Sequence, residues 1–108
     1  MAVVEPAAVE VAAPEHVPDG VWRVVRTGGL LPPLVGVRKR IADGRGVTSM
    51  GPLPGASFTV EGLSLIYGAP FRGFVDVLAP DEEGFSGRAL FRGREYGRFL
   101  MRPAAGNE

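Results

Sequence analysis

The most regular stretch of the sequence is FSGRALFRGREYGRFLMR, residues 85–102, and it decides the fold. Small or apolar residues alternate in it with polar ones, which is the pattern of a β-strand with one buried face. Gly93-Arg94 supplies a turn in the middle, so the stretch predicts an antiparallel hairpin. The residues predicted to face inward are Phe85, Gly87, Ala89 and Phe91 on its first strand, and Gly97, Phe99 and Met101 on its second.

Shorter segments with the same alternation precede this hairpin, and each is closed by a turn signal. Asp43-Gly44 is the strongest signal, because a type I′ turn needs a positive φ at both central positions. Glu61-Gly62 and the polar loop 80–84 provide two more. No long window keeps a helical period. The predicted strands are Gly20–Thr27, Val35–Ala42, Arg45–Met50, Ser57–Glu61, Leu63–Tyr67, Phe71–Ala79, 85–92 and Glu95–Arg102.

These eight short strands predict an all-β fold in which each strand lies beside its sequence neighbour. A small up-and-down antiparallel barrel is the most economical arrangement, because closure removes both exposed sheet edges. An orthogonal sandwich is the alternative. We expect one barrel domain over residues 19–103. Residues 1–18, rich in Ala, Pro and Glu, are expected to form a flexible extension, and residues 104–108 a flexible tail.

The composition excludes several classes of chemistry. The chain has 108 residues, no Cys and a single His, His16 in the extension. Disulfides, thiolate metal sites and triad hydrolysis are therefore not expected, and G-x-S-x-G and phosphate-loop motifs are absent. We expect neither a metal nor a cofactor. Without a signal-peptide pattern or a long apolar run, the sequence predicts a cytoplasmic protein with no membrane span.

The charges cancel overall but are unevenly placed. Residues 1–19 hold four acids and no base, so the rest of the chain is mildly basic. An arginine series marks the final hairpin: Arg88, Arg92, Arg94, Arg98 and Arg102. We interpret these residues as a solubilising outer face, and binding of a phosphate or carboxylate is the alternative. No nucleic-acid partner is expected, because the series has no interleaved exposed aromatic residue apart from Tyr96.

Large apolar side chains on the inferred inner face are the first candidates for binding a ligand. Small residues on the same face, such as Gly73 and Gly87, would leave part of the interior unfilled. The apolar loop after the first strand would cover the opening, and Tyr67 would supply a hydroxyl anchor. The predicted ligand-binding residues are Trp22, Leu30, Leu31, Leu34, Phe58, Tyr67, Phe71, Phe91 and Phe99.

Asp76 is the most unusual residue of a predicted strand, because strands disfavour Asp. A carboxylate held in an apolar cavity can serve as a general acid or base, so Asp76 and Tyr67 are the candidate catalytic residues. Alternation, however, places Asp76 on the face opposite to Phe71, Gly73, Val75 and Val77, which are predicted to point inward. The favoured interpretation is therefore that Asp76 faces outward and pairs with an arginine such as Arg88. Tyr96 is also predicted to face outward.

The tripeptide Gly20-Val21-Trp22 stands at the head of the first predicted strand. A Gly-x-Trp in this place, followed by eight antiparallel strands, resembles the lipocalin-like (calycin) barrels. The resemblance implies that Trp22 packs across the closed end of the barrel, beneath an arginine of the last strand, Arg98 or Arg102. It also implies an interior that takes one small apolar molecule.

Three functions remain open on this sequence. The leading hypothesis is binding of a small hydrophobic or amphipathic molecule inside the barrel. The second is a cofactor-free cyclase or isomerase that uses the same cavity. The third is a protein-interaction module that uses the loop 30–34 or the arginine series, with a homodimer among its candidate assemblies.

Overall fold

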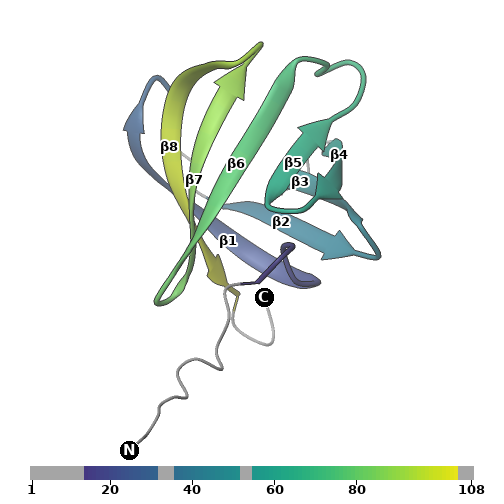
Figure 1. Cartoon of the computed structure of the whole chain (residues 1–108), viewed down its shortest axis with the longest axis vertical. Helices are drawn as coiled ribbons and strands as arrows, with labels where there is room; N and C mark the ends of the chain where they lie inside the picture. The colour runs from purple at the N-terminus through teal and green to yellow at the C-terminus, as the bar shows by residue number, and fades with distance from the viewer. Residues whose placement is uncertain (1–13, 32–35, 52–54, 105–108) are drawn as a thin grey trace, which may run out of the picture.

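The computed structural model describes residues 14–31, 36–51 and 55–104, and these form eight strands and no helix. Each strand pairs antiparallel with its sequence neighbour, and the last pairs with the first, so the sheet closes into a barrel (Figure 1). The predicted all-β up-and-down barrel is confirmed. The strands are β1 (Gly20–Gly29), β2 (Val37–Ala42), β3 (Arg45–Met50), β4 (Ala56–Glu61), β5 (Ser64–Tyr67), β6 (Phe74–Asp81), β7 (Gly84–Phe91) and β8 (Arg94–Pro103).

The inward face of β6 differs from the prediction. Residues 68–73 form turns, in which Phe71 N donates to Gly68 O at 2.8 Å, so the strand begins at Phe74 rather than at Phe71. Its buried side chains are those of Asp76 and Leu78, whereas Val75 and Val77 are only partly buried. The predicted inward orientation of Gly73, Val75 and Val77 is therefore wrong, whereas Phe71, which precedes the strand, lines the cavity. The alternation of β6 allows either face to be buried, and the structure buries the face that carries the carboxylate.

Tyr96 also departs from the prediction, because β8 contains a bulge. Leu90 of β7 pairs with Glu95 and Ala89 pairs with Gly97, which leaves Tyr96 as the extra residue. A bulge re-aims a side chain that strict alternation would send to the other face. Tyr96 consequently lines the interior, and the predicted outward orientation is wrong.

One end of the barrel is closed by side chains and by the segment that precedes β1. Trp22 packs edge-on against Phe85, with ring centroids 5.5 Å apart, and its Nε1 donates to Pro18 O at 3.4 Å. Val17 is 1% exposed, and its N–H bonds Gly62 O in the turn after β4. In Figure 1 the chain enters at this lower end, where the turns after β2, β4 and β6 also lie.

The arginines of β8 bind acids rather than the indole ring. Arg102 Nη1 donates to Asp81 Oδ1 at 2.8 Å, and Arg98 Nε donates to Glu95 Oε2 at 2.6 Å. The one cation–π contact of an arginine within the described residues is that of Arg92 over Phe91. The arginine that the family resemblance places against Trp22 is thus not found there.

Across the described residues, no helix is long and apolar enough to cross a membrane.

Gly87 allows β7 and β8 to pack closely, and we predict that this site tolerates no side chain. A Cβ on Gly87 would overlap the ring of Phe99, whereas one on Gly28 would have no atom within 4 Å. Gly87→Ala should therefore lower the free energy of unfolding by about 1–3 kcal/mol through overpacking, and Gly28→Ala should leave it nearly unchanged. Urea denaturation of both variants measures the difference. Equal stabilities would show that Phe99 does not lie over Gly87.

Candidate functional site

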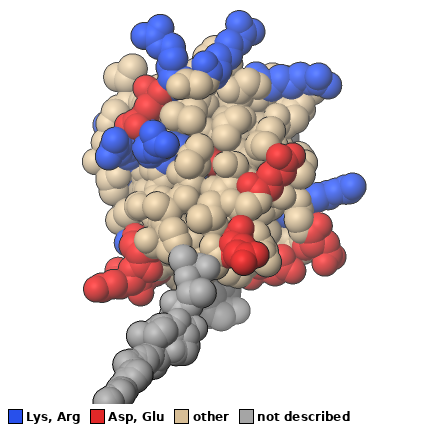
Figure 2. All heavy atoms as spheres, in the orientation of Figure 1, with Lys and Arg blue, Asp and Glu red and all other residues tan. Residues whose placement is uncertain are grey.

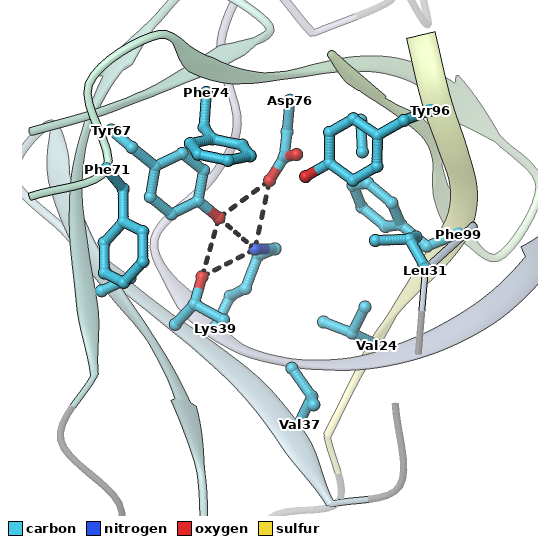
Figure 3. A pocket seen from close by; sticks show the side chains of 13 residues that line it. Val24, Leu31, Val37, Lys39, Tyr67, Phe71, Phe74, Asp76, Tyr96 and Phe99 are labelled. Atoms are coloured by element: carbon cyan, nitrogen blue, oxygen red, sulfur yellow. Dashed lines mark hydrogen bonds and ion pairs between the residues drawn. The ribbon is translucent and has the colours of Figure 1, made fainter. Parts of the chain in front are cut away.

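A cavity of about 270 Å³ lies inside the barrel, and Leu31 and Phe71, which stand beside the turns at the end opposite Trp22, are among the residues that line it (Figure 3). Its wall is mainly apolar and aromatic, with a small group of polar side chains at its inner part. The lining residues are Val24, Leu31, Val37, Lys39, Thr48, Ala56, Tyr67, Phe71, Phe74, Asp76, Ala89, Tyr96 and Phe99.

Lys39 and Asp76 form a buried ion pair at the floor of this cavity. Lys39 Nζ lies 3.2 Å from Asp76 Oδ2, and the two residues are 3% and 6% exposed. Nζ also donates to Thr48 Oγ1 at 2.7 Å and to Tyr67 OH at 2.6 Å. An ammonium has three hydrogens and no acceptor, so these three oxygens satisfy it completely. We call these four residues, Lys39, Thr48, Tyr67 and Asp76, the polar floor.

The topology brings the polar floor together from two sides of the barrel. Lys39 on β2 and Thr48 on β3 are opposite each other in the strand register. Tyr67 ends β5, and Asp76 lies on β6, the next strand in the ring. Because β2 and β6 are four strands apart in a ring of eight, Lys39 reaches across the interior to its partner. The hydrogen bonds therefore tie opposite walls of the barrel.

The hydroxyl hydrogens of the polar floor follow from its hydrogen bonds. Tyr67 OH donates to Asp76 Oδ2 at 2.8 Å, so it accepts from Thr48 Oγ1, which lies 2.9 Å away. Thr48 in turn accepts from Lys39. Each hydroxyl in this arrangement has one hydrogen and uses it once. Every hydrogen of these side-chain polar groups is thus used within the cluster, and the chain of hydrogen bonds ends at Asp76 Oδ2, which only accepts.

Burial shifts the proton affinities of this network. Burial lowers the pKa of Lys39, and the nearby Asp76 carboxylate opposes that change. Burial, and then the charge of Asp76, raise the pKa of Tyr67 well above its ordinary value of 10.0. The rings of Phe58 and Phe99 lie 5.5 and 5.7 Å from Lys39 Nζ and offer it their negative faces, whereas Tyr67 meets it through the hydroxyl oxygen. Acceptors and rings together hold a cation in an otherwise apolar interior.

An aromatic group surrounds the upper part of the cavity. Phe74 packs against Phe91, Tyr96 and Phe71, with ring centroids 4.6, 5.9 and 6.2 Å apart. Leu31 lies at the mouth directly over Gly97, where a Cβ would overlap the leucine side chain. The absence of a side chain at Gly97 therefore leaves room for Leu31 at the opening.

The two ends of the barrel carry opposite charge. Figure 2 shows Lys and Arg gathered at the end drawn at the top, and most of the visible Asp and Glu in the lower half. Arg72, Arg92 and Arg94 are exposed in or beside the turns at the open end, and Asp81, Glu82 and Glu83 are exposed at the closed end. The open end thus presents a positive potential to an approaching molecule.

The predicted ligand-binding residues fall in different places. Leu31, Tyr67, Phe71 and Phe99 line the cavity. Phe58 is buried against Tyr67, with ring centroids 5.4 Å apart, and Trp22 lies at the closed end. Leu30 and Phe91 are 86% and 38% exposed, and Leu34 lies outside the described residues.

Asp76 and Tyr67, the candidate catalytic residues, meet in the polar floor. The favoured outward orientation of Asp76 with Arg88 as its partner is wrong, since Arg88 pairs with Glu95 at 3.6 Å. Sequence reasoning missed Lys39, although it shares the alternation of Val37 and Ile41 and is the only lysine of the chain. A single lysine on the apolar face of a predicted strand was the signal in the sequence that could have identified it.

Known proteins add no further information on this site. Among the residues that the structure describes, no group of three or more His, Cys, Asp or Glu could hold a metal ion. Comparisons with family models, with curated proteins and with solved structures found no match for the chain.

We predict that both tyrosines of this chain ionise at a higher pH than a tyrosine exposed to water. The chain has two Tyr, and burial raises the pKa of Tyr67 and of Tyr96. Above pH 10.0 the unfolded chain loses tyrosine protons that the native barrel keeps, so stability falls as the pH rises through that range. Absorbance of ionised tyrosine should therefore appear only above pH 10.0, in two transitions, with Tyr67 ionising at the higher pH. Tyr96→Phe should remove the earlier transition and keep the later one. Two tyrosines titrating normally would contradict the buried network.

Proposed function

We propose that the barrel binds one small, mainly apolar molecule, which enters at the open end and sets a polar group against the polar floor. The observation that carries this proposal is an open-ended, aromatic-walled cavity whose only charged lining residues are Lys39 and Asp76, among the residues that the structure describes. Apolar walls with a few convergent polar groups are typical of small-molecule sites. The closed eight-stranded barrel and the position of Trp22 support a likeness to the lipocalin-like barrels.

The size of the cavity limits the ligand. An apolar cavity of about 150 Å³ accepts benzene. A volume of about 270 Å³ therefore suits a molecule of about two fused rings, with any longer part projecting from the mouth. Burial of apolar surface would drive binding, at roughly 25 cal/mol per Å² before the cost of association.

A second function, cofactor-free acid–base catalysis, has one observation in its favour. Tyr67 and Lys39 face the cavity with shifted pKa values, and both touch the Asp76 carboxylate. Groups of this kind cluster at catalytic sites as well as in structural ion pairs. An isomerase or cyclase would release a rearranged molecule, whereas a binding protein would release its ligand unchanged.

Filling the cavity should abolish binding without disturbing the outer surface. Ala89 is buried and lines the cavity, whereas Ala79 on β6 is exposed, so Ala89→Leu and Ala79→Leu form a matched pair. Native mass spectrometry of the protein purified from its own host should show one small molecule per chain for wild type and for Ala79→Leu. Ala89→Leu should give the bare chain mass. A bare wild-type mass, or an unchanged mass excess in Ala89→Leu, would contradict the proposal.

A further inference from the structure

We infer that the ligand's inner polar group is a neutral hydroxyl, held between the Asp76 carboxylate and the Tyr96 hydroxyl. The inference rests on the proposed function and names the chemical class of the ligand. It follows from which polar atoms at the inner end of the cavity are already bonded and which are not.

Lys39 and Tyr67 have no hydrogen to offer a ligand. The three hydrogens of the Lys39 ammonium go to Thr48, Tyr67 and Asp76, and the Tyr67 hydroxyl gives its hydrogen to Asp76 Oδ2. A ligand that took either donor would have to break a buried hydrogen bond, which leaves an unsatisfied group behind. These residues therefore fix the position of Asp76 and leave the contact with the ligand to other atoms.

Among the polar side-chain atoms of the residues that line the cavity, two have no hydrogen bond to a described residue. Every hydrogen bond and ion pair of the Asp76 side chain uses Oδ2, so Oδ1 is unpartnered although the side chain is only 9% exposed. Tyr96 OH makes no hydrogen bond, and Figure 3 shows it pointing toward the Asp76 carboxylate. Asp76 contributes to the raised pKa of Tyr96, which agrees with their proximity. A buried carboxylate oxygen without a donor is costly, so this position favours a group that donates.

The charge balance of the floor selects a neutral group. Lys39 and Asp76 cancel each other, so a ligand carboxylate would meet the free oxygen of Asp76 with no spare cation beside it. A ligand ammonium would compete with Lys39 for one carboxylate. A hydroxyl can donate to Asp76 Oδ1 and accept from Tyr96 OH at the same time. The rings of Phe74 and Phe99 line the cavity beside these atoms, so a ring alcohol or a phenol fits best.

Calorimetric titration with three probes of one shape tests this inference. The probes are 2-methylnaphthalene, 2-naphthalenemethanol and 2-naphthoate, titrated in about 0.5 M salt so that the rim arginines are screened. The alcohol should bind about tenfold or more tightly than the hydrocarbon, because a hydrogen bond to a charged acceptor is stronger than one between neutral groups. The carboxylate should bind no more tightly than the hydrocarbon.

Two variants separate the hydroxyl contact from general packing. Tyr96→Phe keeps the ring. It should weaken binding of the alcohol by about threefold or more and leave the affinity for the hydrocarbon unchanged. Phe71→Leu removes part of the apolar wall near the mouth. It should weaken binding of the alcohol and of the hydrocarbon by the same factor, so that the ratio of their affinities stays unchanged. Binding of hydrocarbon and alcohol with equal affinity, or of the carboxylate as tightly as the alcohol, would overturn the inference and leave the proposed function standing. Failure of all three probes to bind would overturn both.

Discussion

An ammonium and a carboxylate share the interior of this barrel, and the orientation of β6 depends on them. Without a cation inside, Asp76 would be expelled to the surface, and the strand would have to bury Val75 and Val77 instead. In a sheet with a period of two, that change moves every side chain of the strand to the other face. Lys39 reaches from the opposite wall and, with Tyr67, holds the carboxylate inside. The pair thus keeps Leu78 in the core and gives the cavity its polar floor.

The two ends of the barrel have different physical roles. At the closed end Val17, Trp22 and Phe85 fill the space between the strands, and these apolar side chains keep water from reaching the ion pair from that end. At the open end aromatic side chains and Leu31 line a mouth surrounded by exposed arginines. Removal of water strengthens the electrostatic interactions of the floor, and the same apolar walls favour an apolar ligand. Stability and the proposed binding function therefore rest on the same interior residues.

Local patterns in the sequence predicted the barrel but only part of the site. The hairpin of residues 85–102 and the Asp43-Gly44 turn were recognisable because their signals lie within a few residues of one another. The face of β6 could not be chosen locally, since the partner that keeps Asp76 inside lies on a distant strand. Tyr96 points inward because of a bulge that leaves no mark on the alternation. Lys39 was detectable in principle, because it stands between Val37 and Ile41 on their face.

A double-mutant cycle on Lys39 and Asp76 tests the central claim most directly. Lys39→Met and Asp76→Leu would each leave a charge buried without its partner, and each should lower the free energy of unfolding by about 3–5 kcal/mol. The double variant buries no charge and should lose less than either single variant, which gives a large coupling energy. Single substitutions that cost under about 0.5 kcal/mol and simply add would contradict the account, because they would place both side chains in water.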